Sequence, residues 1–253
     1  MKKKSVYYWS PFLTPIATCK AVINSAYSLN RFGKDFDATI MNFFGEFNQN
    51  ISEITQKKIN LLNFYNLNII NYLPKYGKIS SRISFLIFFM LGFLPLLKIL
   101  KKKSPDYIVI HLITSLPLIL LVLFSFKTKF ILRISGLPRI NMFRKLLWKL
   151  AFKKIHLITC PTNETNNYLK SLNLCDKKKF KILFDPIIHV SKINNKIKDE
   201  IDQKEDFYVS VGRLTKQKNF LFLCECFKEL IKRYPTIKLF IIGEGENFYL
   251  LNV

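Results

Sequence analysis

The stretch FYVSVGRLTKQKN, residues 207–219, decides the fold of this chain. Its first five residues are largely aromatic or β-branched, which is typical of a buried strand, and Gly212 ends that strand. Apolar residues then recur at helical spacing over 220–233, and Asn219 is a suitable N-cap for this helix. A second apolar run, KLFII at 238–242, also stops at a glycine. This order of strand, loop, helix and strand predicts a βαβ unit in a parallel sheet.

The loop between the first strand and the helix is basic. Arg213, Lys216 and Lys218 lie at the carboxyl edge of the predicted sheet, beside the free N–H groups of a helix start. A guanidinium fork, a mobile ammonium group and the helix dipole together suit a diphosphate. The alternative, a solvated basic loop in a lysine-rich chain, is equally compatible with the spacing alone.

VGRLTKQKN followed by a helix, a Tyr-Pro pair and LFIIGEGE resembles the start of the nucleotide-sugar domain in family 4 glycosyltransferases of the GT-B fold. The resemblance implies that Arg213 and Lys218 hold the diphosphate of a nucleotide-sugar donor, next to Gly212. It also implies that the loop Gly243, Glu244 and Gly245 lies near the nucleotide. The family requires no cofactor besides its donor substrate.

The expected fold class is therefore α/β of the GT-B type. We predict one complete Rossmann-like domain on the acceptor side (1–190), a charged linker (191–206) and the start of a nucleotide-sugar-binding domain (207–253). The family's glutamate pair, which grips the donor sugar, would follow later in the chain, so we expect a C-terminally truncated enzyme with impaired activity. The short second sheet predicts partial exposure of four apolar side chains: Phe207, Val209, Phe240 and Ile242.

The first domain carries the positions that the resemblance assigns to the acceptor side. The loop after the first strand, residues 10–18, faces the acceptor in relatives, and Thr14 is its candidate contact. His111 matches a strand-end histidine of the family, for which a structural role in the core or a loop is the favoured alternative. Gly136 follows Ser135, which stands where many relatives carry a histidine that supports the reaction centre. A serine cannot match the charge or reach of an imidazole.

Three segments raise the question of a membrane. The run 85–97 is apolar on all sides with basic ends, and both a core helix and an interfacial helix fit it. The run 107–126 is long enough to span, but Pro105 and Pro117 favour a strand followed by a helix. A basic amphipathic helix is predicted over 141–154, either docked on the domain or in contact with lipid.

The composition limits the partners. The net charge is +23 and 49% of the residues are hydrophobic, which excludes a disordered chain. No nucleic-acid motif accompanies the charge, so we expect an anionic membrane surface as the partner rather than nucleic acid. Five cysteines without ligand spacing are expected to be reduced and buried as small hydrophobic residues, and three scattered histidines predict no metal site.

These observations lead to one expected function: transfer of a sugar from a nucleotide-diphosphate sugar to a lipid-linked or oligosaccharide acceptor in surface polysaccharide synthesis. The resemblance implies a retaining enzyme of the hexosyltransferase type. We expect it in the cytoplasm, peripheral to the inner face of the membrane. Two alternatives are an inactive, membrane-associated remnant of such an enzyme and an integral membrane protein that spans at 107–126.

Overall fold

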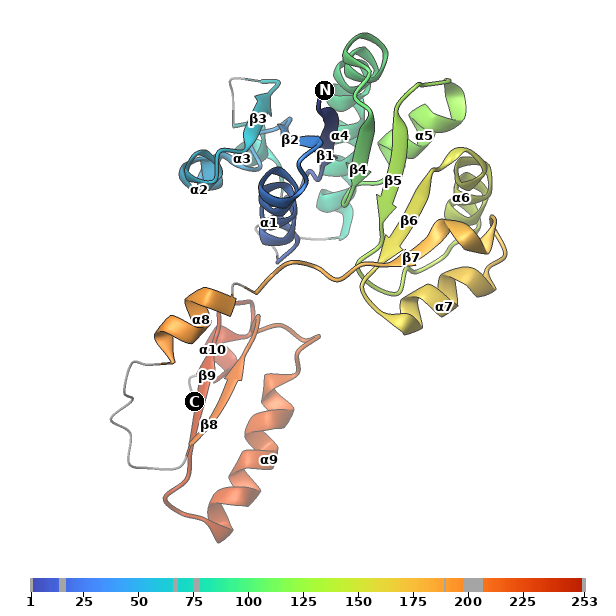
Figure 1. The fold of residues 1–253 in the computed structure, drawn as a ribbon. Helices are drawn as coiled ribbons and strands as arrows, with labels where there is room; N and C mark the ends of the chain where they lie inside the picture. The colour runs from blue at the N-terminus through green and yellow to red at the C-terminus, as the bar shows by residue number, and fades with distance from the viewer. Residues whose placement is uncertain are drawn as a thin grey trace. The chain divides into compact units, whose positions relative to one another are not determined.

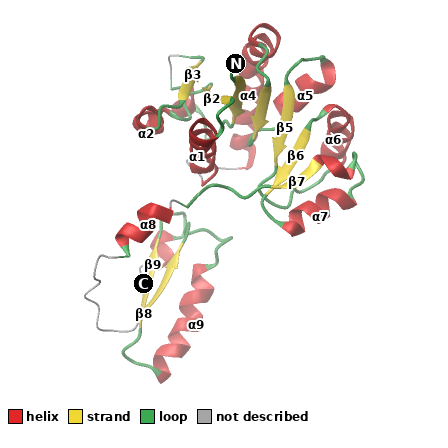
Figure 2. Cartoon of the chain, in the orientation of Figure 1, coloured by secondary structure: helices red, strands yellow, loops and turns green. Residues whose placement is uncertain are grey.

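The computed structural model describes residues 2–13, 17–65, 68–74, 78–188, 190–197 and 207–251. The chain divides into two compact units, Met1–His189 and Val190–Val253, and we describe each by itself. Helices and strands alternate along most of both units, as Figures 1 and 2 show. This alternation is the α/β organisation predicted from the sequence.

The first unit is built on a seven-stranded parallel sheet with the strand order β3-β2-β1-β4-β5-β6-β7. The chain moves outward from β1 in one direction and then from β4 in the other, as in doubly wound folds. Its strands are β1 (Lys4–Trp9), β2 (Phe36–Asn42), β3 (Asn60–Asn63), β4 (Tyr107–Ile110), β5 (Lys129–Arg133), β6 (Leu157–Cys160) and β7 (Phe180–Ile182).

Right-handed crossovers place the connecting helices on both faces of this sheet. On one face, α1 (Ala17–Phe32) and α2 (Ile51–Gln56) pack over β1, β2 and β3. On the other face, α5 (Ser115–Leu123) lies between α4 (Lys78–Lys98) and α6 (Met142–Lys154). The remaining elements are α7 (Asn163–Ser171), the short helix α3 (Ile69–Tyr72), the 3-10 turns η1 (Asn48–Asn50) and η3 (Lys177–Lys179), and the π-helical turn η2 (Ile99–Lys103).

The strands in the middle of the sheet alternate their side chains between two different environments. Ile108 and Ile110 of β4 are fully buried in the larger core, together with side chains of α4, α5 and α6. Tyr107 and Val109 point to the opposite face, where α1 lies. Strands β5 and β6 repeat this alternation, so one face of three neighbouring strands is fully packed and the other is not.

The apolar runs of the first unit form elements of the sheet fold. The run 107–126 forms β4 and the nine-residue helix α5, as the prolines predict, and not a spanning helix. The run 85–97 lies within α4, which buries Phe88 and Leu96 but exposes its opposite side. The helix predicted over 141–154 is present as α6, and Asn141 caps it by accepting a hydrogen bond from the Arg144 N–H.

The second unit contains the predicted βαβ unit. Strands β8 (Phe207–Val211) and β9 (Lys238–Ile242) pair in parallel, and α9 (Phe220–Arg233) connects them. The partial exposure predicted for apolar residues of these strands is confirmed, with side chains between 39% and 57% exposed. A last short helix, α10 (Phe248–Leu251), follows β9.

One local prediction in this unit was wrong. Asn219 precedes α9 but adopts a left-handed conformation, φ 52°, and its side chain makes no capping hydrogen bond. Asparagine tolerates the left-handed conformation better than most residues. Its role before the helix is therefore to allow this backbone turn, and not to cap the helix with its side chain. The segment predicted as a linker begins with a helix, α8 (Val190–Lys196), within the described residues. Of the cysteines, Cys19 and Cys160 are buried as expected, whereas Cys226 is exposed.

Phe88 is the residue whose loss we expect to destabilise the larger core most clearly. It is fully buried on α4 and stacks on Phe44 with ring centroids 4.3 Å apart. Phe88→Ala should lower the free energy of unfolding by about 3–5 kcal/mol, because a cavity remains where the ring was. The matched change Phe143→Ala, at a side chain 72% exposed, should cost less than about 0.5 kcal/mol. Urea denaturation of the two variants measures the difference, and equal losses would contradict this assignment of the core.

Candidate functional site

The second unit brings the two predicted donor loops together, backbone against backbone. The N–H of Leu214 donates to the carbonyl of Glu244 at 2.9 Å, and the N–H of Asn247 donates to the carbonyl of Leu214 at 3.0 Å. A Cβ on Gly243 would lie 1.9 Å from the carbonyl oxygen of Gly212. A Cβ on Gly245 would lie 2.3 Å from the carbonyl oxygen of Leu214. Only glycine fits at these two positions, since no Cβ approaches backbone atoms so closely.

The cations of the first loop remain available at this edge of the small sheet. Arg213 and Lys218 are both exposed, and within the described part of the chain neither takes part in an ion pair. Helix α9 starts directly after Lys218 and Asn219, and its first N–H groups have no intrahelical partners. The loop can therefore present positive charge and free N–H donors to an anion.

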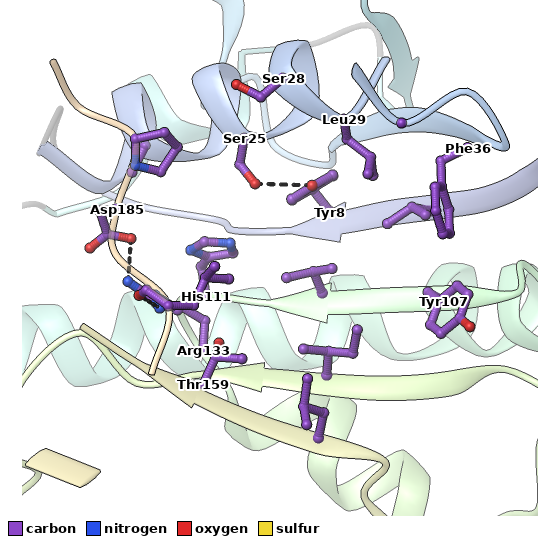
Figure 3. A pocket seen from close by; sticks show the side chains of 18 of the residues that line it. Tyr8, Ser25, Ser28, Leu29, Phe36, Tyr107, His111, Arg133, Thr159 and Asp185 are labelled. Carbon is purple, nitrogen blue, oxygen red and sulfur yellow. Dashed lines mark hydrogen bonds and ion pairs between the residues drawn. The ribbon is translucent and has the colours of Figure 1, made fainter. Parts of the chain in front are cut away.

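The first unit has a groove of about 680 Å³ on the face that carries α1 (Figure 3). Its floor is formed by the side chains of β4, β5 and β6 that point away from the larger core. Its walls come from α1 and from the segment that follows β7. The groove is mostly apolar along the strands and becomes polar at their carboxyl ends, where His111, Arg133, Thr159 and Asp185 lie.

His111 and Arg133 are buried titratable groups of this groove. Arg133 pairs with Asp185, Nη2 to Oδ1 at 2.7 Å, and also donates to the carbonyl of Leu183. His111 is 8% exposed, and neither of its ring nitrogens has a hydrogen-bond partner in the described part of the structure. Burial, with the Arg133 guanidinium nearby, lowers the pKa of His111 to about 3, so the imidazole is neutral.

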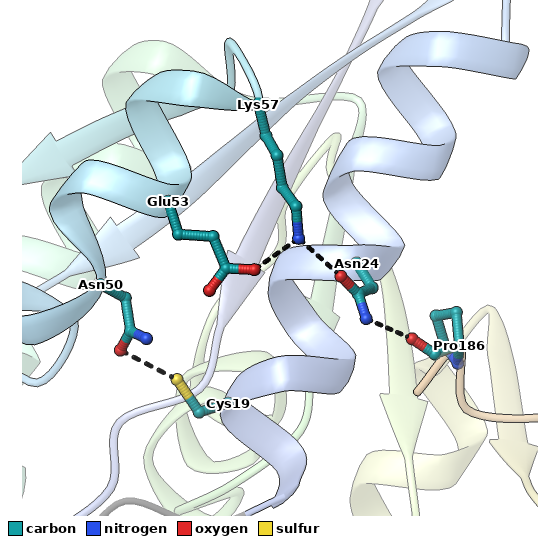
Figure 4. A network of polar contacts seen from close by, with 6 residues as sticks. All are labelled: Cys19, Asn24, Asn50, Glu53, Lys57 and Pro186. Carbon is teal, nitrogen blue, oxygen red and sulfur yellow. Dashed lines mark hydrogen bonds and ion pairs between the residues drawn. The ribbon is translucent and has the colours of Figure 1, made fainter. Parts of the chain in front are cut away.

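A polar network fixes the segment that closes the groove (Figure 4). The Asn24 amide of α1 donates to the carbonyl of Pro186 at 2.7 Å. Lys57 donates to Asn24 and pairs with Glu53, which ties α2 to α1. Together with the Arg133–Asp185 pair, these contacts hold residues 183–186 across the carboxyl ends of the strands.

A second, smaller pocket of about 290 Å³ lies where β1, β2 and β3 end. Phe12 and Leu13 from the loop after β1 contribute to it, and so do Asn48, Gln49, Asn68 and Asn71. The carboxylate of Glu46 is buried here and accepts hydrogen bonds from the N–H groups of Phe44 at 2.7 Å and Phe43 at 3.3 Å. Burial nevertheless raises the pKa of Glu46 to about 7, because desolvation of the charged form exceeds the effect of these donors.

The structure separates the predicted acceptor-side residues. Thr14 lies outside the described residues. His111 lines the groove, whereas Ser135 and Gly136 are exposed in the loop after β5 and line neither pocket. A Cβ on Gly136 would meet no atom within 4 Å, so its glycine is not required by packing. Among the described residues, no cluster of three potential metal ligands occurs.

Two polar residues of these pockets were not predicted from the sequence. Glu46 is the one acid in the apolar run FFGEF, and Arg133 ends the apolar strand KFILR. A charged residue inside an apolar run was the available signal, because such a residue is buried only if it is paired or hydrogen-bonded.

Comparison with known proteins bears on both units. Residues 191–252 match the family model described as glycosyl transferases, group 1. This part of the chain is therefore similar to that family. A curated relative, an uncharacterized glycosyltransferase of Methanocaldococcus jannaschii, is 28% identical over 172 residues, which are 60% of this chain and 42% of the relative. The chain thus spans less than half the length of that curated relative.

Solved structures show the fold of the whole chain. A glycosyltransferase from Rickettsia africae matches 96% of this chain and 69% of its own with a TM-score of 0.57 at 14% identity. TarM matches 98% of this chain and 73% of its own, with a TM-score of 0.65 at 11% identity. MnaA of S. aureus, solved with UDP, gives 0.60 at 10% identity and covers all of this chain and 64% of its own. The predicted GT-B fold class and the resemblance to glycosyltransferases are confirmed.

Glu46 and His111 should affect stability with opposite dependence on pH. The pKa of Glu46 rises on folding from 4.5 to about 7, so the folded state binds more protons between these values and stability falls as pH increases. The pKa of His111 falls from 6.5 to about 3, so the unfolded state binds more protons there and stability rises with pH. Between pH 4.5 and 6.5 the two contributions oppose each other, at about 1.4 kcal/mol per pH unit each.

Single substitutions should therefore reveal each contribution. In Glu46→Gln only the contribution of His111 to the pH dependence remains. The free energy of unfolding of this variant should therefore decrease more steeply than that of the wild type as pH falls from 6.5 to 4.5. In His111→Gln only the contribution of Glu46 to the pH dependence remains. The free energy of unfolding of this variant should therefore increase relative to that of the wild type over the same fall in pH. Urea denaturation at intervals of half a pH unit measures both profiles. Parallel profiles for the three proteins would show that these groups are not titrated by folding.

Proposed function

We propose that this protein is a glycosyltransferase that moves a sugar from a nucleotide-diphosphate sugar to a lipid-linked or oligosaccharide acceptor. The observation that carries the proposal is the close backbone pairing of two loops that require glycine. Beside them lie two cations without an ion-pair partner among the described residues, in the part that matches the group 1 family. The UDP in the structure of the similarly folded MnaA is consistent with a nucleotide ligand for this fold.

The donor diphosphate is proposed to lie against the loop 212–218 and the start of α9. When the bond between the sugar and the diphosphate breaks, negative charge increases on the departing phosphate oxygens. Arg213 and Lys218 stabilise this charge electrostatically, and the first N–H groups of α9 add donors. The acceptor hydroxyl forms the new glycosidic bond to the sugar carbon that the diphosphate leaves, its proton passes to the departing phosphate oxygen, and the nucleoside diphosphate is released. By resemblance to the family, we propose that the enzyme is of the hexosyltransferase type and retains the configuration of the sugar.

For the acceptor, the pocket beside Glu46 offers suitable chemistry. Carboxamide groups donate and accept hydrogen bonds, as the hydroxyl groups of a sugar require, and four of them line this pocket. We propose surface polysaccharide synthesis, of the lipopolysaccharide or capsule type, as the process, with the protein peripheral at the inner face of the membrane. The net charge of +23 supports attraction to anionic headgroups there.

The alternative is a protein that keeps the fold without catalysing transfer. Nucleotide binding separates the two functions before any acceptor is known. Calorimetric titration of the 253-residue chain with a panel of nucleoside diphosphates and their sugars should give heat for at least one of them. No binding to any member of the panel would favour the inactive alternative, and a radiolabelled sugar-transfer assay with membrane lipids then tests turnover.

Arg213→Ala and Lys218→Ala should each weaken the binding of the diphosphate. Each change removes a charge-assisted hydrogen bond of about 1.5–3 kcal/mol, which corresponds to a dissociation constant roughly 10- to 100-fold higher. Lys228→Ala is the matched control, because Lys228 is also exposed but lies in the middle of α9. If all three variants bound the nucleotide like the wild type, the diphosphate site would not be this loop.

A further inference from the structure

Helix α4 carries an apolar stripe on the side that faces away from the sheet. Its opposite side is core, where Phe88 and Leu96 are buried and a Cβ on Gly92 would touch Leu116 at 2.9 Å. The stripe repeats every three or four residues, so its members lie along one line of the helix. They are Ile83 (50% exposed), Leu86 (62%), Met90 (69%) and Leu94 (62%).

Cations stand at both ends of this stripe. Arg82 precedes it and is exposed. At the other end, the end of α4 and the following turn η2 expose a group of lysines: Lys98, Lys101, Lys102 and Lys103. An apolar line with cationic ends is the pattern of a helix that lies in the plane of a membrane interface, with its charges among the headgroups.

A second helix of the same layer repeats the pattern. Helix α6 buries Trp148 and Phe152 against the core, and α5 lies between it and α4. On its outer side α6 exposes Met142 (89%), Phe143 (72%), Leu146 (58%) and Leu150 (43%). Exposed cations lie among these residues, namely Arg144, Lys145, Lys149 and Lys153. The layer thus exposes two parallel sets of apolar and basic side chains.

By length and composition alone, the segment Arg82–Lys103 could cross a membrane, with a mean hydropathy of 2.4, but one third of its most apolar window is buried in the protein. It also connects β3 to β4, which are parallel strands of one sheet. A crossover helix packed on its own sheet cannot span a bilayer unless the larger core opens. The geometry therefore favours a helix that lies on the membrane over one that spans it.

The charge argues against a second copy of the chain as the occupant of this face. A symmetric contact would bring the same lysine clusters towards each other, in a protein that already carries a net charge of +23. Anionic headgroups complement these cations, and acyl chains accept the apolar stripe without a matching protein surface.

We propose that the outer face of α4 and α6 docks into an anionic membrane surface, with the stripe Ile83, Leu86, Met90 and Leu94 in the interface and the lysines of η2 on the headgroups. This deepens the peripheral placement proposed above by assigning it to a named surface. It does not depend on catalysis, because vesicle binding is measured without donor or acceptor.

Sedimentation with vesicles tests the proposal. The 253-residue chain should bind vesicles of phosphatidylcholine with one third phosphatidylglycerol, and bind pure phosphatidylcholine weakly. Leu86→Gln, Met90→Gln and Leu94→Gln combined should lower the partition coefficient at least about tenfold, because the inserted apolar area is lost. Lys101→Gln, Lys102→Gln and Lys103→Gln combined should abolish most of the preference for the anionic vesicles and its dependence on salt.

The matched control changes three exposed apolar residues outside this layer: Tyr72→Gln, Ile188→Gln and Tyr249→Gln, at side chains 83%, 71% and 84% exposed. It should bind like the wild type, and circular dichroism checks that each variant melts like its parent. Three results would overturn the proposal. These are wild-type binding by the stripe variant, a wild-type dimer that the stripe variant dissociates without any vesicle binding, and vesicle-bound protein that alkaline carbonate fails to release.

Discussion

A parallel sheet must be covered on both faces, because its strands carry apolar side chains in both directions. In the first unit this requirement is met completely on one face, where α4, α5 and α6 bury Ile108, Ile110 and their neighbours. On the other face, α1 and α2 cover the side of β1, β2 and β3. The groove lies over β4, β5 and β6, where no helix of the described part of this unit completes the second layer.

This unequal coverage also explains the polar groups of the groove. Arg133 follows Leu132 on β5 and shares its face of the sheet with Ile131, so a strand that puts Leu132 into the core must turn Arg133 to the α1 face. A buried guanidinium requires an anionic partner, and Asp185 supplies it. His111 lies at the end of β4, beside this pair. Its imidazole stays neutral because burial and the neighbouring guanidinium both oppose its protonation.

The sequence predicted the elements well where local pattern determines them. Strands β8 and β9 and helix α9 were placed because glycines and helical spacing mark their ends. Features that depend on distant packing were not predictable. Glu46 is buried by loops that follow three different strands, and the two sides of α4 look alike in composition although only one meets the sheet. The conformation of Asn219 depends on the loop that it closes, which no capping preference specifies.

In the two predicted donor loops, 212–218 and 243–245, some residues are required by the fold and others are not. Gly243 and Gly245 are required by sterics alone, because any side chain there would overlap the backbone of the neighbouring loop. A glycine at these two positions is therefore evidence for the fold, and not by itself evidence for a ligand. Arg213 and Lys218 differ, since both are exposed and neither has an ion-pair partner in the described structure. The fold places no such demand on their charge, and this freedom supports the proposed diphosphate site at these two positions.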